Sequence, residues 1–212
     1  MHFVRTLLVG AAAAAAVALG AGQAFAAGDI TITGAGGAFS ATGTIVLGDP
    51  TSGQSFQCTV TLTGSLANVT NAPLPYTTMQ ANGSAHSITG WSFGGCTSSF
   101  GSLTPSVPAA DLPDDLVFTT VSATAPQAGG FLQSAGTAGA LFHLSVLTCG
   151  FSVAGQANFT WTNGTAGQLK LPGTGTLHPI GVSSGCFGLV SATDTLTLTG
   201  TLTVTPSSIM IG

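Results

Sequence analysis

The sequence is almost devoid of charged side chains. Its 212 residues include two basic residues, Arg5 and Lys170, six aspartates and no glutamate. Nucleic acids are bound through clustered lysine and arginine side chains, so nucleic acid is a poor partner for this chain. The same shortage argues against anionic membrane surfaces. Disorder is also disfavoured, because disordered chains combine low hydrophobicity with high charge, whereas 44% of this chain is hydrophobic.

Helix-forming stretches are also lacking after the first 26 residues. Glycine, proline, serine and threonine interrupt every alanine-rich segment, and β-branched residues dominate the periodic stretches. Many short strands separated by turn signals are typical of a sandwich or a barrel. An outer-membrane barrel needs aromatic girdles and a polar lumen, but Tyr76 is the single tyrosine. We therefore predict an all-β, antiparallel β-sandwich without helices beyond the N-terminal segment.

The N-terminal segment has the features of a cleavable export signal. A short basic start, Met1–Arg5, precedes the alanine-rich apolar run Leu7–Leu19, and Ala24–Ala26 supplies a small-x-small cleavage site. The apolar run is too short to span a bilayer well. We predict that residues 1–26 are a signal peptide and that residues 27–212 form one exported domain with no integral membrane span. The protein is then secreted or held at the cell surface.

Four cysteines in an exported chain predict two disulfides. Of the three possible connectivities, the nearly equal spans favour Cys58–Cys96 with Cys149–Cys186. A zinc site is the alternative, but no two cysteines have C-x-x-C spacing and an exported chain meets oxidising conditions. We expect no metal and no cofactor.

A repeated segment precedes the last cysteine of each predicted pair. Residues His86–Cys96 (HSITGWSFGGC) and His178–Cys186 (HPIGVSSGC) both run through histidine, isoleucine, glycine, serine, glycine and cysteine. The simplest explanation is a duplicated β-unit. We predict a sandwich of two similar halves, about 39–125 and 140–206, each stapled by its own disulfide.

Alternation of threonine with apolar residues predicts the individual strands. The change of parity at Cys149 predicts a bulge or bend there. A Ser/Pro/Asp-rich insert follows Cys96, and 125–139 is the predicted bridge between the halves, while Asn82-Gly83 is a hairpin-turn signal. The predicted strands are 39–47, 57–63, 116–124, 141–149, 149–161 and 194–206.

The last strand, 194–206, shows the clearest alternation. Its apolar residues are predicted to face the core, and its threonines to face solvent. A long uncharged strand is an edge that natural proteins normally protect with lysine or proline, and here Pro206 alone protects it. The sequence therefore predicts an edge strand available for self-association. The predicted core residues are Leu196, Leu198, Leu202 and Val204.

Two segments match the Gly-x-Ser-x-Gly pattern of a hydrolase nucleophile, centred on Ser92 and Ser183. That chemistry needs the serine on a tight strand-to-helix turn with histidine and aspartate within reach. A formal triad is Ser92, Asp111 or Asp115, and His143. Because the pattern occurs twice beside half-cystines and helices are lacking, we predict that neither serine is catalytic.

Other candidate sites have weaker support. His86, His143 and His178 lack close ligand spacing, so we expect them to bond backbone groups rather than a metal. The acidic run 111–115 lacks the ligand spacing of a calcium loop, and we predict a solvated turn. Trp91 lies in a glycine-rich segment and is the residue that we predict as a possible contact for a ligand.

Several segments together resemble a known bacterial family. They are Phe39–Ile45 (FSATGTI), Cys58–Gly64 (CTVTLTG) and Ser87–Gly90 (SITG), followed by the Cys149–Cys186 half and a terminal Thr/Leu/Val strand. The chain is similar to the secreted activators of alkane oxidation, of the PraB type. The resemblance implies an extracellular or surface-associated protein, without catalytic apparatus, that helps cells meet hydrophobic substrates or surfaces.

Three functions therefore follow from the sequence. The first is a secreted non-enzymatic protein of the cell surface or extracellular matrix, with a hydrophobic substrate or surface as its partner. The second is a self-assembling adhesive subunit of a fibre, coat or biofilm, which would use the terminal strand. The third is a serine hydrolase that would use Ser92, and our prediction is against enzymatic activity.

Overall fold

The computed structural model describes residues 28–77, 87–98, 101–136 and 139–212. The predicted signal peptide, the Asn82-Gly83 turn and His86 lie outside the described residues. Within these ranges the chain is all-β, its strands pair antiparallel, and the helical content is one three-residue 3₁₀ segment, η1 (Ser184–Cys186). The predicted all-β class is confirmed.

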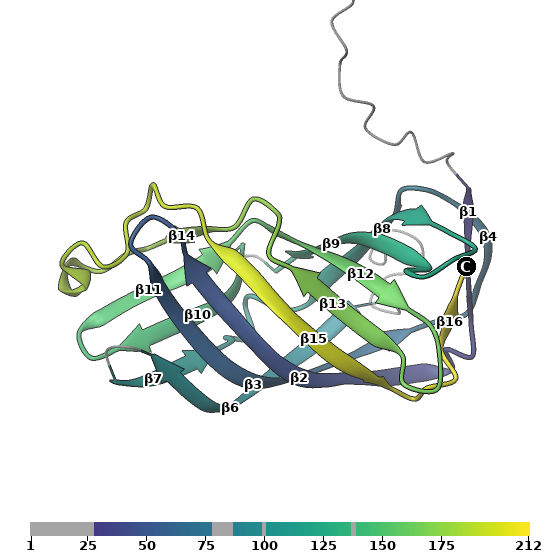
Figure 1. Cartoon of the computed structure of the whole chain (residues 1–212), viewed down its shortest axis with the longest axis horizontal. Coiled ribbons are helices and arrows are strands. Elements are labelled where there is room, and N and C mark those ends of the chain that lie inside the picture. Colours follow the sequence, from purple (N-terminus) through teal and green to yellow (C-terminus); the bar gives the residue numbers. More distant parts are fainter. Residues whose placement is uncertain (1–27, 78–86, 99–100, 137–138) are drawn as a thin grey trace, which may run out of the picture.

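Eight strands form a closed barrel, drawn across the middle of Figure 1. The order around the barrel is β6-β3-β2-β15-β13-β12-β9-β8, and β8 returns to β6 where Asp114 lies opposite Ile88. Closure pairs the strand edges that an open sheet leaves exposed. The strands are β2 (Gly37–Asp49), β3 (Gln54–Leu66), β6 (Ser87–Ser98), β8 (Asp114–Val121), β9 (Ala128–Ser134), β12 (Gln156–Thr162), β13 (Gln168–Pro172) and β15 (Thr197–Thr205).

The barrel corrects the predicted sandwich of two similar halves. Strand β15 from the second half lies between β13 of the same half and β2 of the first half, so strands of both halves belong to one closed barrel and not to two separate units. Periodicity in a sequence shows which face of a strand is buried, but it does not show which strand lies beside it. The repeated segments also differ in structure, because Cys96 lies in a strand and Cys186 in η1.

Four further strands extend the sheet beyond β6, toward the left in Figure 1. They are β7 (Gly101–Ser106), β10 (Ala140–Val146), β11 (Cys149–Ala154) and β14 (His178–Ile180). Strand β7 lies in the insert where we predicted no strand. The parity change predicted at Cys149 arises from a two-residue turn between β10 and β11, at which Val146 pairs with Cys149.

The other end of the molecule carries a small sheet of three strands, on the right in Figure 1. Its central strand β1 (Asp29–Thr33) pairs with β4 (Val69–Pro73) and with the C-terminal β16 (Met210–Ile211). The two-residue β5 (Tyr76–Thr77) pairs with β8. Asn163 also holds the C-terminus, since its Nδ2 donates to the Ile211 carbonyl at 2.7 Å and its Oδ1 accepts from the Ile211 amide at 2.9 Å.

The core follows the predicted alternation. In β3 the side chains of Cys58, Val60 and Leu62 are buried, while Thr59 and Thr63 are exposed. The four predicted core residues of the last strand, Leu196 to Val204, are also buried. The prediction that this strand is an edge is wrong, because β15 pairs along its length with β13 on one side and β2 on the other. Its backbone is therefore not free to pair with a strand of another copy in the folded protein.

Replacing Leu198 with alanine should destabilise the fold by about 2–5 kcal/mol, since the side chain is fully buried between neighbouring strands. Thr201→Ser is the matched control, because Thr201 lies on the same strand with its side chain exposed. Urea denaturation followed by circular dichroism measures both. Equal stability of the two variants would contradict the assignment of the buried face.

Candidate functional site

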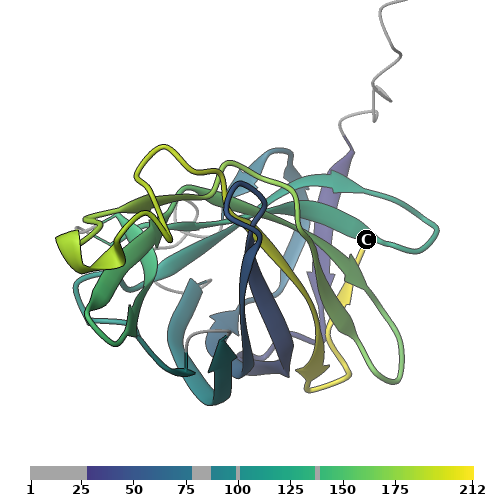
Figure 2. The same cartoon turned by 60° about the vertical axis from the view of Figure 1, so that its left-hand side comes forward.

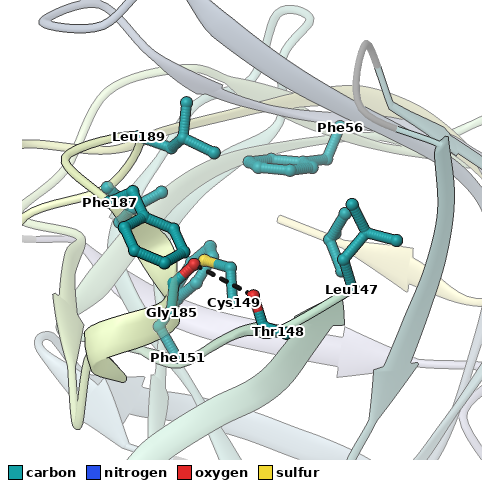
Figure 3. Close-up of a pocket in the computed structure, with 10 residues that line it drawn as sticks. Phe56, Leu147, Thr148, Cys149, Phe151, Gly185, Phe187 and Leu189 are labelled. Carbon is teal, nitrogen blue, oxygen red and sulfur yellow. Dashed lines mark hydrogen bonds between the residues drawn. The ribbon is translucent and has the colours of Figure 1, made fainter.

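An apolar pocket of about 200 Å³ opens at the end of the molecule opposite the small sheet. One wall is the tip of the β10–β11 hairpin, and the other is the irregular segment 181–190, which contains η1 (Figures 2 and 3). Strand β3 contributes Phe56. An engineered apolar cavity of roughly 150 Å³ holds benzene, so this pocket has room for one small apolar group. The lining residues are Phe56, Val146, Leu147, Thr148, Cys149, Phe151, Gly185, Phe187, Leu189 and Val190.

Leu147 and Phe187 stand at the rim of the pocket, on opposite walls (Figure 3). Their side chains are 83% and 85% exposed, the highest values among the large hydrophobic residues that the structure describes. Both also have a left-handed backbone, with φ of 52° and 46°. This conformation costs a residue with a side chain about 1–2 kcal/mol, and glycine or asparagine is preferred at such turns. Folding alone therefore does not account for a leucine and a phenylalanine here.

Ser183 anchors segment 181–190 to the hairpin. Its amide donates to the Gly150 carbonyl at 2.8 Å, and its hydroxyl accepts from the Gly150 amide at 2.9 Å and donates to the Thr148 carbonyl at 3.1 Å. A Cβ at Gly185 would lie within 2.2 Å of the Thr148 carbonyl oxygen, so the close approach requires glycine. Ser183 thus has a structural role in this arrangement.

Both predicted disulfides are present, and all four cysteines are bonded. Cys58–Cys96 joins the adjacent strands β3 and β6 beside a bulge, whereas Cys149–Cys186 joins the start of β11 to η1. Disulfides form and persist in oxidising compartments. The disulfides therefore indicate that the protein works in an oxidising environment.

His143 forms a hydrogen-bonded chain with Asp111 and Ser152. Its Nε2 lies 2.6 Å from Asp111 Oδ2, and its Nδ1 lies 2.7 Å from Ser152 Oγ. With the ring proton on Nε2, the imidazole donates to the carboxylate and accepts from the serine hydroxyl. The partner of His143 is thus Ser152 and not Ser92, which lies exposed in the middle of β6.

This chain of residues does not have the arrangement of a hydrolase site. Ser152 lies within β11, directly opposite His143 in the β10–β11 ladder, and is 9% exposed. A nucleophile elbow instead places its serine on a sharp strand-to-helix turn beside free amide donors. The hydrogen bonds among these three residues connect the 107–113 segment to the sheet, and we interpret them as a structural link.

Trp91 lies in an aromatic cluster apart from the apolar pocket. Its ring stacks on Phe93 at a centroid distance of 5.8 Å and contacts Phe142 at 5.4 Å. Its indole N–H donates to Asp114 Oδ2 at 2.6 Å. The side chain is half-buried and does not line the pocket. A contact between Trp91 and a ligand stays a prediction.

Asp111, Asp114 and Asp115 are buried, so the predicted solvated turn at 111–115 is wrong. Burial raises the pKa of Asp114 to about 8; the hydrogen bond from Trp91 lowers it, and the nearby charge of Asp111 raises it. In the described ranges no group of three or more histidine, cysteine or acidic side chains is placed to hold a metal ion. His178 bonds the Thr176 carbonyl.

The molecular surface carries almost no charge. Of the six aspartates, Asp29 is exposed and the other five are buried, and Lys170 is the exposed basic residue of the described chain. Outward-facing threonines on β3 and β15 present neutral hydroxyl groups on the barrel wall instead. Such a surface has a low cost of desolvation, since neutral polar groups lose less hydration energy than ions.

No helix within the described ranges has the length and apolar character needed to cross a membrane. Comparisons of the chain with protein-family models, with curated proteins and with solved structures found no match in any of the three.

The sequence contained a signal for the pocket that periodicity alone did not reveal. Phe187 stands between Cys186 and Gly188, and Leu147 is out of phase with the buried residues of β10. An apolar residue that interrupts an alternating pattern beside a half-cystine is a candidate for an exposed contact. The predicted site residues Cys149 and Cys186 lie at this pocket, and Trp91 does not.

Proposed function

We propose that the protein is an exported, non-enzymatic protein of the cell surface or extracellular matrix that binds hydrophobic substrates or surfaces through the apolar pocket. The observation that carries this proposal is the pair Leu147 and Phe187, both strained in backbone and more than four-fifths exposed. Strained residues persist where function favours them. The proposal agrees with the resemblance to the secreted activators of alkane oxidation, and includes export through residues 1–26.

The nearly uncharged surface supports the same function. A protein that approaches oil, lipid or polymer must remove water from the surfaces that meet, and removing water from ions is expensive. Asp29 lies in the small sheet at the end opposite the pocket. Contact through the pocket end should therefore depend little on salt concentration.

The test is binding of the uncharged fluorescent dye N-phenyl-1-naphthylamine to the parent and to Leu147→Asn and Phe187→Asn. Burying a leucine or phenylalanine side chain contributes roughly 1.5–3 kcal/mol, so each substitution should weaken binding roughly tenfold to a hundredfold. The melting temperature should stay the same or rise, because asparagine tolerates the left-handed backbone better.

Met210→Asn is the matched control, since Met210 is a 45% exposed hydrophobic residue at the far end of the molecule. It should bind the dye as the parent does. A parent that binds no dye, or pocket variants that bind as tightly as Met210→Asn, would refute the proposal.

No observation favours the two alternative functions. The self-assembling subunit depended on a free edge at the last strand, which is paired on both sides. The hydrolase depended on Ser92, which is not the serine bonded to His143.

A further inference from the structure

We propose that the Cys149–Cys186 disulfide assembles the apolar pocket, so that the protein gains its binding site only when this bond is oxidised. This inference rests on the proposed function and assigns the two disulfides different roles. Cys149–Cys186 positions the two walls of the pocket, and Cys58–Cys96 stabilises the barrel.

The Cys149–Cys186 bond lies between the two walls of the pocket. Cys149 directly follows the hairpin turn that carries Leu147, and Cys186 directly precedes Phe187. Both half-cystines are buried under the pocket, and Cys149 is part of its lining. The disulfide thus links the turn that carries Leu147 to the segment that carries Phe187.

Beyond Cys186, the outer wall is held to the rest of the molecule mainly by the packing of Val190 into the core. Segment 181–190 contains no strand. Three hydrogen bonds join Ser183 to the hairpin, and Thr148 Oγ1 donates to the Gly185 carbonyl at 3.3 Å. Beyond Cys186, the Leu189 amide donates a hydrogen bond to the Cys186 carbonyl, and this bond lies within the segment. Without the disulfide, the residues of this wall from Phe187 onward lose their covalent attachment to the hairpin.

Cys58–Cys96 differs from this bond in its surroundings. That bond joins two strands already paired on both sides of the cysteines, with Gln57 opposite Thr97 and Thr59 opposite Gly94. The ladder keeps β3 and β6 in register when the bond is absent. Loss of Cys58–Cys96 should therefore lower stability and leave the pocket walls in place.

The oxidation itself is ordinary thiol–disulfide exchange. The thiolate of one cysteine attacks a disulfide-bearing oxidant, and the second thiolate then displaces it. The two cysteines lose two protons and two electrons, and the oxidant leaves as a dithiol. A chain kept reduced before export thus has an unassembled pocket, and an exported chain has a complete one.

The experiment compares Cys149→Ala/Cys186→Ala with Cys58→Ala/Cys96→Ala, using the dye N-phenyl-1-naphthylamine and far-ultraviolet circular dichroism. We expect the first variant to bind the dye about tenfold more weakly or worse, with its β-sheet spectrum retained. The second should bind as the parent does, with a lower melting temperature.

A second measurement tests the same role of the disulfide if the first variant does not fold. In the Cys58→Ala/Cys96→Ala background, dithiothreitol reduces the one remaining disulfide, which mass spectrometry confirms. Dye binding should fall on reduction and return on reoxidation. Unchanged binding after complete reduction, or in Cys149→Ala/Cys186→Ala, would overturn the role of this disulfide while the proposed function stands. A parent that binds no dye overturns the proposed function itself.

Discussion

Raising the pH from 4 to 9 should destabilise the protein by about 5 kcal/mol, because Asp114 must ionise inside the fold. Burial raises the pKa of Asp114 from 3.8 to about 8. The native state therefore holds a proton that the unfolded chain releases near pH 4. The stabilisation is complete below the unfolded pKa and is lost as the pH rises through the folded pKa.

Urea denaturation at intervals between pH 4 and pH 9 measures this effect. Asp114→Asn should remove most of the pH dependence, since the amide does not ionise and its oxygen can still accept from Trp91. Asp29→Asn is the control, because Asp29 is exposed, and it should keep the parent's profile. Parallel profiles of stability against pH for the parent and Asp114→Asn would contradict the raised pKa of Asp114.

Asp49 affects stability in the opposite direction and outside this range. Burial raises the pKa of Asp49, but hydrogen bonds from Ser52 and Thr51 together lower it below 3.8. Its contribution is present above the unfolded pKa and is lost as the pH falls through the folded pKa. The loss of stability between pH 4 and pH 9 therefore does not come from Asp49.

Replacing His143 with leucine should cost about 3–5 kcal/mol, because it leaves the carboxylate of Asp111 buried without its hydrogen-bond partner. Asp111 is 0% exposed, so water does not replace the imidazole. Ser152 loses its bond to the same ring. The large effect follows from the structural role that we give this chain of residues.

Asp111→Leu/His143→Leu should recover much of that loss, since removing both partners leaves no buried charge. His178→Leu is the control, because that histidine is exposed and bonds a backbone carbonyl. Its effect should stay within about 0.5 kcal/mol. Chemical denaturation at pH 7 compares the variants, and a His143→Leu protein as stable as His178→Leu would contradict the structural role.

Much of the strand content could be predicted from the sequence. The alternation around Val60 and Leu62 identified β3 and its buried face, and the last strand was equally clear. The disulfide pairing followed from the matched spans. The strands and their buried faces are local features, and the alternation of apolar and polar residues identifies them directly.

The order of strands could not be predicted because it depends on contacts between distant segments. β15 pairs with β2, about 150 residues away in the chain, and the sequence of neither strand identifies its partner. β9 was missed because its glycines disfavour a strand. Gly130 is needed there, since a Cβ would overlap the backbone of Val117 in the neighbouring β8.

The candidate site was predicted only in part. Cys149 and Cys186 were identified, but the exposure of Leu147 and Phe187 depends on how a turn and an irregular segment meet in space. Buried aspartates were missed for the same reason. Proline and aspartate are typical of solvated turns, and tertiary packing buries Asp111 and Asp114 here.

The most direct test of the central claim is to map where an apolar molecule binds, by methyl and amide NMR shifts on adding n-octane to the exported protein. We expect saturable shifts at Val146, Leu147, Leu189 and Val190, which line the pocket. The threonine-covered barrel wall should stay unchanged. Shifts confined to other parts of the molecule, or no shifts at saturating octane, would contradict the assignment of this pocket as the binding site.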